Sequence, residues 1–105
     1  MTTRAAADLR NLAEAAQQRL DAGDGASALR LFSQMLQQDI AQAQAFFGAG
    51  QALELMGDDT GAAASWRHAL TLDPELAAAH GALAGLAARR REWVGVREEA
   101  ELALA

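Results

Sequence analysis

The chain has 105 residues, enough for one domain with a real core, and it contains no Cys. Disulfides, thiolate metal sites and cysteine nucleophiles are therefore excluded. Fourteen acidic residues against nine basic ones give a formal net charge of −5 at pH 7, a sign that phosphate backbones repel, so we expect no nucleic-acid partner.

The N-terminal segment is too polar for a signal peptide, because its apolar residues are interrupted by Asp8, Arg10, Asn11 and Glu14. No stretch approaches the roughly 20 apolar residues that span a bilayer. All nine basic residues are Arg and Ala is abundant, a coding bias typical of a GC-rich bacterial genome. We expect a cytoplasmic bacterial protein that does not insert into a membrane.

Helix formers dominate the chain and strand formers are few. Apolar residues recur at helical spacing in two early segments, first at Leu9, Leu12, Ala16 and Leu20 and then at Leu29, Phe32, Leu36 and Ile40. Gly and Asp-Pro interrupt the chain at 23–25, 57–61 and 73–74. The sequence therefore predicts an all-α fold of about six helices, near residues 4–21, 26–38, 43–56, 60–72, 75–90 and 93–104. We expect Asp59 or Thr60 to cap the fourth helix and Asp73 the fifth.

Two stretches of the chain are nearly the same: residues 23–40 read GDGASALRLFSQMLQQDI and residues 57–74 read GDDTGAAASWRHALTLDP. We call the displacement from position 23 to position 57 the repeat shift. It pairs Gly23 with Gly57, Asp24 with Asp58, Ala28 with Ala62, Phe32 with Trp66, Leu36 with Leu70 and Asp39 with Asp73. Such a period indicates helix pairs that bury a core by stacking on their neighbours.

This pattern resembles the tetratricopeptide repeat (TPR) family, whose unit is a helix pair of about 34 residues. The central copy matches best, at Phe46, Ala49-Gly50, Leu53, Gly57-Asp58, Ala62, Trp66, Ala69 and Pro74. The first copy has Arg19 where an aromatic residue is usual and Ile40 in place of Pro, and the third replaces the turn Gly-Asp by Arg91-Glu92.

The resemblance implies one TPR domain over residues 1–105. Its three units would cover residues 9–42, 43–76 and 77–105, the last of them incomplete and uncapped. We expect three stacked antiparallel helix pairs that form a short right-handed superhelix.

In this family the first helix of each unit lines a concave groove, which implies a site for a peptide or helix of a partner protein. The expected groove residues are Gln17, Gln44, Phe47, Gly48, Gln51, Leu55, Gly81 and Gly85. Phe47 is the only aromatic residue of this wall and would receive an apolar anchor, while the glutamines supply hydrogen bonds. An equally open alternative is that Phe47 packs on a neighbouring helix and the glycines only permit close stacking.

One subfamily grips C-terminal carboxylates with Lys, Asn and Arg side chains. That clamp is absent here, because the matching positions are Ala13, Gln17, Gly48, Ala78 and Ala82.

Catalysis and cofactor binding have little support in the sequence. His68 and His80 are the only histidines, and no acid or Cys spacing completes a metal site around them. We expect a packed, hydrogen-bonded ring at His80 and a solvated ring at His68. Arg89, Arg90 and Arg91 are expected at a helix end, where positive charge meets the negative end of the helix dipole. We therefore predict no enzyme and no cofactor.

The sequence leaves two functions open. One is an adaptor or chaperone-like scaffold that binds another protein in the groove. The other is a self-assembling structural unit, or an excised piece of a longer repeat array, that associates through its uncapped C-terminal helix. That helix is more apolar than a free flank should be, with Trp93, Val94, Val96, Leu102 and Leu104.

Overall fold

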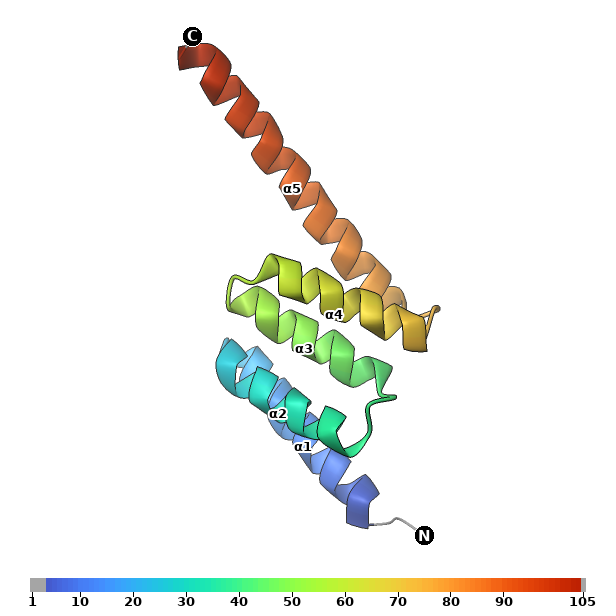
Figure 1. Cartoon of the computed structure of the whole chain (residues 1–105). Coiled ribbons are helices and arrows are strands. Elements are labelled where there is room, and N and C mark those ends of the chain that lie inside the picture. Colours follow the sequence, from blue (N-terminus) through green and yellow to red (C-terminus); the bar gives the residue numbers. More distant parts are fainter. Residues whose placement is uncertain (1–3, 105) are drawn as a thin grey trace.

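The computed structural model describes the backbone of residues 4–104 and the side chains of residue 4 and residues 6–91. Over this backbone the chain is all-helical and contains no strand, as predicted. Five helices follow one another, α1 (Arg4–Asp21), α2 (Gly25–Gln38), α3 (Ala43–Leu55), α4 (Asp59–Leu72) and α5 (Ala77–Leu104) (Figure 1).

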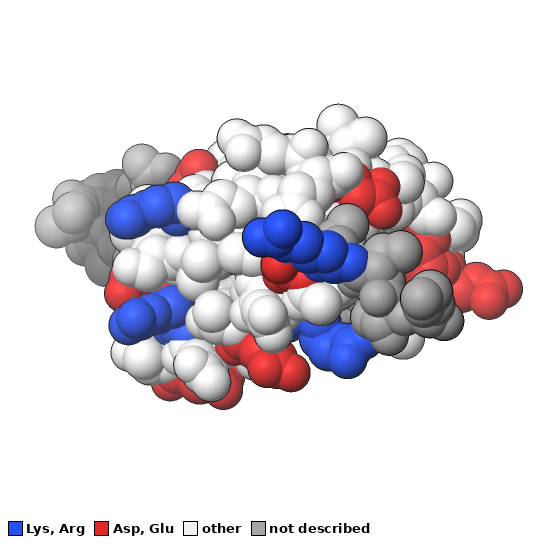
Figure 2. All heavy atoms as spheres, turned by 90° about the horizontal axis from the view of Figure 1, so that it is seen from below, with Lys and Arg blue, Asp and Glu red and all other residues white. Residues whose placement is uncertain are grey.

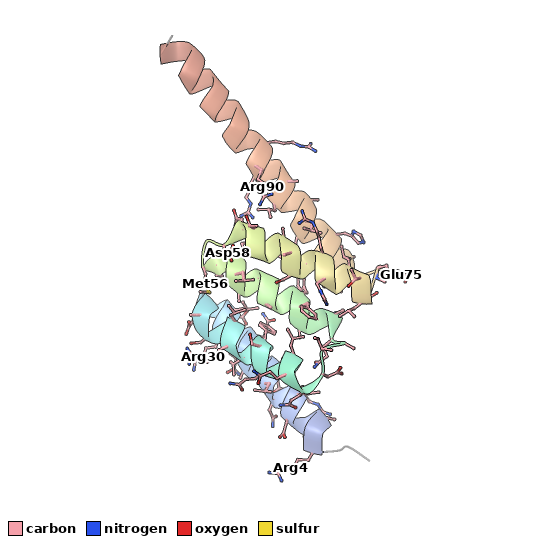
Figure 3. All side chains as sticks on the ribbon, viewed as in Figure 1. Arg4, Arg30, Met56, Asp58, Glu75 and Arg90 are labelled. Carbon is pink, nitrogen blue, oxygen red and sulfur yellow. The ribbon has the colours of Figure 1, made fainter. Side chains whose placement is uncertain are left out.

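The helices pack in chain order. α1 contacts α2, α2 contacts α3, α3 contacts α4, and α4 contacts α5, while α1 also reaches α3. The turn from α3 to α4, marked by Met56 and Asp58 in Figure 3, lies at one side of the stack, and the turn at Glu75 lies at the other. The radius of gyration is 16.7 Å, against about 13 Å for a compact domain of this size. The molecule is therefore an elongated stack of helices.

The turns after α1 and α3 have the same construction and are related by the repeat shift. Gly23 has φ 76° and Gly57 has φ 84°, a left-handed conformation that glycine adopts without strain. The next N–H in each turn, that of Asp24 or Asp58, donates to the helix carbonyl five residues earlier, at 2.8 and 2.9 Å. These hydrogen bonds pair carbonyls of the last helical turn that have no N–H partner within the helix. This role explains why the sequence repeats Gly-Asp.

The same two aspartates then begin the following helices. The side chain of Asp24 accepts from the Ser27 N–H at 3.1 Å, and that of Asp58 accepts from the Gly61 N–H at 2.9 Å. Hydrogen bonds from Ser27 hold the pKa of the Asp24 carboxyl below its usual value. The expectation that Asp59 or Thr60 caps α4 is wrong, because the turn already places Asp58 at the N-cap and Asp59 begins the helix.

The ends of α2 and α4 are also alike. Asp39 and Asp73 have extended backbones, and their N–H groups donate to the helix carbonyl four residues earlier, at 3.0 and 2.9 Å. Each carboxylate also accepts a hydrogen bond from the backbone N–H two residues later. The Ala41 N–H donates to Asp39 at 3.0 Å, and the Glu75 N–H donates to Asp73 at 3.2 Å. The repeat shift of the sequence therefore recurs in both kinds of turn.

The core consists of two clusters in which small residues allow close helix contact. The first joins α1, α2 and α3 through Ala16, Ala28, Phe32, Met35, Ala45, Ala49 and Ala52. The second joins α4 and α5 through Ala62, Ala63, Trp66, Ala79 and Leu86, with Phe47 and Leu53 of α3 packed against it.

Two glycines of α3 receive the large rings of the core. Phe32 lies over Gly48 and Trp66 lies over Gly50, and a Cβ atom at either glycine would overlap the ring. The Trp66 side chain is 1% exposed, and its Nε1 donates to the Phe47 carbonyl at 3.2 Å. α3 is therefore fixed from both sides.

The C-terminal region differs from the prediction. The break expected at Arg91-Glu92 does not form, and α5 runs unbroken for 28 residues. The positions that match Gly57 and Asp58 carry Arg91 and Glu92, both good helix formers, so nothing stops the helix. The fold therefore has two helix pairs and one long helix in place of three pairs, and α5 projects beyond the other helices (Figure 1).

The surface carries charge of both signs. On the face in Figure 2, which looks onto the end of the stack that α1 and α2 form, acidic and basic side chains are interspersed. None of the helices between residues 4 and 104 combines the length and the apolar composition that a membrane crossing needs.

Candidate functional site

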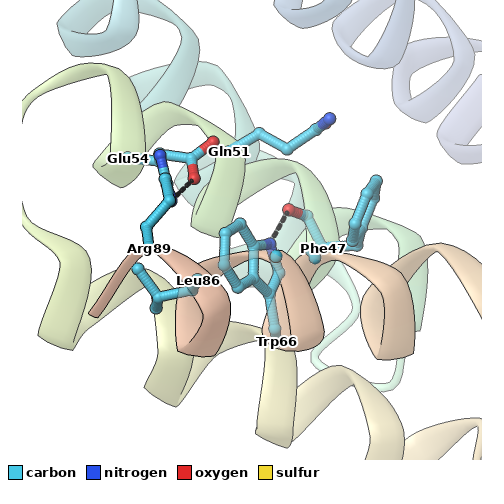
Figure 4. A pocket seen from close by; sticks show the side chains of 8 residues that line it. Phe47, Gln51, Glu54, Trp66, Leu86 and Arg89 are labelled. Carbon is cyan, nitrogen blue, oxygen red and sulfur yellow. Dashed lines mark hydrogen bonds and ion pairs between the residues drawn. The ribbon is translucent and has the colours of Figure 1, made fainter. Parts of the chain in front are cut away.

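Two hollows adjoin along α3. The first measures about 230 Å³ and lies between α1, α2 and α3, where it is lined by Ala13, Gln17, Phe32, Met35, Gln44, Phe47, Gly48 and Gln51. The second measures about 250 Å³ and lies between α3, α4 and α5, where it is lined by Phe47, Gln51, Glu54, Trp66, Ala82, Gly85, Leu86 and Arg89 (Figure 4). Phe47 and Gln51 belong to both, so these two side chains separate the hollows. We call the two hollows together the α3 groove.

The floor of the α3 groove is apolar and rigid. Phe32 and Trp66 belong to the core clusters and are nearly inaccessible, while Phe47 is half-buried. The helix that carries Phe47 is held in place by the Trp66 hydrogen bond to the Phe47 carbonyl. A groove of this kind can hold apolar side chains without rearranging first.

Glutamines supply the polar groups of the groove. Gln17 and Gln44 are exposed at its first hollow, and Gln51 is half-buried between the two. The Gln17 amide donates to the Asp21 carboxylate at 3.0 Å, which leaves the Gln17 carbonyl oxygen as an acceptor. Amide groups of this type can pair with both the N–H and the C=O of a bound backbone.

An ion pair lies at the rim of the second hollow. The Arg89 guanidinium donates to Glu54 at 2.5 Å, and it joins α5 to α3 (Figure 4). The two side chains are 52% and 36% exposed, so the pair adds little stability. Both side chains line the second hollow, so the pair adds opposite charges to its lining. Arg89 therefore lies inside a helix, and the expectation of an arginine cluster at a helix end is wrong.

Six of the eight residues predicted for the groove line these hollows, namely Gln17, Gln44, Phe47, Gly48, Gln51 and Gly85. Gly48 has no side chain and contributes backbone only, and the Phe32 ring lies over it. Leu55 lies outside, in the last turn of α3 against Gly25, with half of its side chain exposed. Gly81 is on an open part of α5, with nothing within 4 Å of a Cβ built there.

Several lining residues lie outside the predicted set. The sequence pattern assigns Phe32 and Trp66 to the core alone, yet their edges form the groove floor. Glu54 is also absent from the prediction, and its link to Arg89 joins residues 35 positions apart. No spacing rule within one helix could reveal that contact, because it depends on how α5 crosses α3.

The two histidines lie away from the groove. His80 Nε2 is 2.8 Å from the Pro74 carbonyl, but the ring is exposed, so the expected hydrogen bond forms and the expected packing does not. His68 is exposed, as expected, and its ring centroid lies 4.1 Å from that of Phe46. Among the described residues, no three His, Cys, Asp or Glu side chains gather where a metal ion could bind.

No protein-family model matches the chain, and no curated protein is significantly similar to it. Membership of the TPR family therefore stays a prediction that rests on the sequence pattern.

Proposed function

We propose that the chain is a protein-interaction module of the TPR type, which holds a peptide or a helix of another protein in the α3 groove. The observation that carries the proposal is the pair of adjoining hollows that share Phe47 and Gln51. An adaptor or chaperone-like role, with no reaction of its own, follows from this proposal.

The groove chemistry supports a partner segment with two apolar side chains. One side chain would enter each hollow, with Phe47 between them, since apolar anchors in preformed pockets dominate the binding energy of such contacts. Gln17, Gln44 and Gln51 would pair with the partner backbone. The Arg89–Glu54 ion pair would lie beside the side chain that enters the second hollow.

The repeated turns support the TPR type. The end of α1 and both ends of α2 recur in α3 and α4 after the repeat shift, and so do both capping patterns. A stack of that period exposes the first helix of each pair along one face, and the predicted groove residues that line the hollows lie on α1, α3 and α5.

The test uses peptides selected from a random display library against the whole chain. Their affinity would be measured for the natural protein, for Phe47→Ala and for the matched control Phe46→Ala. Phe46 has the same side chain one residue earlier, but it contacts His68 and lines neither hollow. We expect Phe47→Ala to weaken binding at least about tenfold and Phe46→Ala to leave it within about twofold, in line with the loss of an anchor residue.

Amide NMR spectra would locate the selected peptides. Binding in the groove shifts the signals of Gln44, Phe47, Gln51 and Gly85 and leaves those of α2 near Arg30 unchanged. Equal affinity for both Phe variants, or shifts confined to other faces, would show that the groove is not the binding site.

A further inference from the structure

Three exposed side chains form a row along one edge of the α3 groove. The repeat shift moves position 21 to position 55 and position 55 to position 89, which carry Asp21, Leu55 and Arg89. All three are exposed, Leu55 by 50%. We call these three residues the edge row. The row has an acid at one end, a base at the other and an apolar side chain between them.

Contacts in the structure support this order. A Cβ atom at Gly25 would lie 3.0 Å from the Leu55 Cβ, so Leu55 lies over the start of α2. Asp21 ends α1, just before the turn that leads to Gly25. On the other side of Leu55, its neighbour Glu54 accepts the hydrogen bond from Arg89 of α5 (Figure 4). Leu55 therefore lies between the end of α1 and Arg89.

The Asp21 carboxylate has no cationic partner. Its Oδ1 accepts a hydrogen bond from the neutral Gln17 amide at 3.0 Å. Among the side chains that the structure describes, Arg89 and Glu54 form the only ion pair, so no Arg is paired with Asp21. Gln17 lines the first hollow, and its hydrogen bond to Asp21 places this negative charge at the rim of that hollow. A basic side chain of a bound segment would complete an ion pair there.

Arg89 is the opposite case, because its guanidinium can bind a second carboxylate. Its Nη2 donates to Glu54, and an arginine has five N–H donors in total. The Arg89 side chain is 52% exposed, more than the 36% of Glu54, and it lines the second hollow. The planar guanidinium binds carboxylates through two parallel hydrogen bonds. The α5 end of the groove therefore suits an acidic side chain.

We propose that the α3 groove prefers a segment with a basic side chain beside Asp21 and an acidic side chain beside Arg89. This inference rests on the proposed function, because it names the chemistry of the segment that the groove holds. α1 and α5 flank α3, and axes of packed helices are about 8–10 Å apart, so α1 and α5 are separated by about 16–20 Å. An extended chain covers that distance in about five or six residues. The base and the acid lie that far apart, with the apolar anchors between them.

The two opposite charges also select the direction in which the segment crosses the groove. In the reverse direction its acid would lie beside Asp21 and its base beside Arg89, and like charges at both ends cost energy. Leu55 faces the middle of the segment in either direction, so it contributes contact but no choice of direction. The edge row therefore acts on specificity more than on affinity.

The first experiment compares two peptides. Each contains the apolar anchors of a groove binder selected from the random library, with Lys and Glu at the two flanks. In the second peptide, Lys and Glu are exchanged. We expect one of the two to bind the natural chain at least about fivefold more tightly, since it forms two exposed ion pairs and the other forms none. Equal affinity for the two peptides overturns the proposal.

Single variants of the chain assign each charge of the tighter peptide. Asp21→Asn keeps an acceptor for the Gln17 amide, and Arg89→Gln keeps a polar side chain of similar length. We expect each to weaken binding about two- to fivefold, the range for one exposed ion pair. Replacement of the peptide Lys by Ala should cancel the effect of Asp21→Asn and leave that of Arg89→Gln. If it cancels neither, Asp21 does not pair with the Lys and the proposal is wrong.

The matched control is Arg90→Gln, which removes the same charge one residue later. Arg90 is exposed and lines neither hollow. We expect this variant to bind the tighter peptide within about twofold of the natural chain, because a charge outside the groove makes no direct pair. A loss as large as that of Arg89→Gln would show that only the total charge of α5 matters, which overturns the proposal.

Glu54→Gln distinguishes Arg89 from its ion-pair partner. The variant keeps an acceptor for Arg89 but removes the carboxylate that competes with the acid of the peptide. We expect it to bind the tighter peptide about two- to fivefold more strongly. Weaker binding would mean that Glu54, and not Arg89, recognises the charge of the segment, and the proposal would be wrong.

Amide NMR separates failure of this inference from failure of the proposed function. A nitroxide on the Lys end of the tighter peptide should broaden the signal of Asp21 and leave that of Arg89 sharp. Peptides that shift the signals of Phe47 and Gln51 but bind equally in both charge orders would support the proposed function and overturn the charge preference. Peptides that bind without those shifts would overturn both.

Discussion

The α3–α4 pair and α5 show how one turn changes the packing of nearly the same sequence pattern. α3 ends after 13 residues at a turn that contains Gly57, and α4 returns along it so that Trp66 covers Gly50. α5 starts in the same way, with Ala79 buried as Ala45 is, but it continues through Arg91 for 28 residues. The α3–α4 pair closes because a glycine forms a left-handed turn at position 57. α5 stays open because its matching position, Arg91, continues the helix.

The largest expected effect comes from removal of the ring that closes the α3–α4 pair. Trp66→Ala deletes a side chain that is 1% exposed and leaves a cavity over Gly50. We expect the free energy of unfolding to fall by about 3–5 kcal/mol. Urea unfolding followed by circular dichroism measures this loss.

Trp66→Phe is the matched control for that truncation. It keeps most of the ring and removes the hydrogen bond to the Phe47 carbonyl, so its cost should stay near about 1–2 kcal/mol. An equal loss in both variants would mean that the hydrogen bond, and not ring packing, holds the pair together.

The next prediction compares a glycine in the closed pair with one on the open helix. Gly50→Ala places a methyl group into the Trp66 indole, and overpacking of this kind costs about 1–3 kcal/mol. Gly81→Ala meets nothing within 4 Å, and Ala favours a helix over Gly by up to about 1 kcal/mol. We therefore expect one substitution to destabilise the protein and the other to stabilise it.

Urea midpoints of the two alanine variants test that difference in sign. If Gly81→Ala destabilises the protein, the α5 surface around residue 81 is covered in solution and is not open. If Gly50→Ala has no effect, the indole moves aside and the α3–α4 contact is looser in solution than in the structure.

The helix boundaries of the first two pairs could be predicted from the sequence, because their signals are local. Gly23 and Gly57 supply left-handed turns, and the aspartates that follow cap the next helices, so each boundary depends on a few neighbouring residues. The end of the chain is different. The repeat pattern favours a turn at Arg91-Glu92, but the local chemistry there favours a helix, and local chemistry decides the structure.

The groove could be predicted only in part. The resemblance to the TPR family implies Gln44, Phe47 and Gln51 as groove residues, and these three line the hollows. The Arg89–Glu54 contact and the exposure of Leu55 depend on the angle at which neighbouring helices cross, which no single-helix pattern contains.

The smallest expected effect concerns the N-cap of α2, in the α1–α2 helix pair. The contribution of this cap to stability can be compared at two pH values. Hydrogen bonds from Ser27 lower the pKa of Asp24, so its ionised form is favoured in the folded state. The contribution of this group is present above the carboxyl pKa of the unfolded chain, about 3.9, and it is lost as the pH falls through the lowered folded pKa. Asp24→Asn keeps an acceptor for the Ser27 N–H but does not titrate. We compare the free energy of unfolding of the natural protein with that of the variant, both measured by urea unfolding. We expect the advantage of the natural protein to be larger at pH 7 than at pH 3. A difference that is the same at both values would show that the Asp24 cap works through its shape and not through its charge.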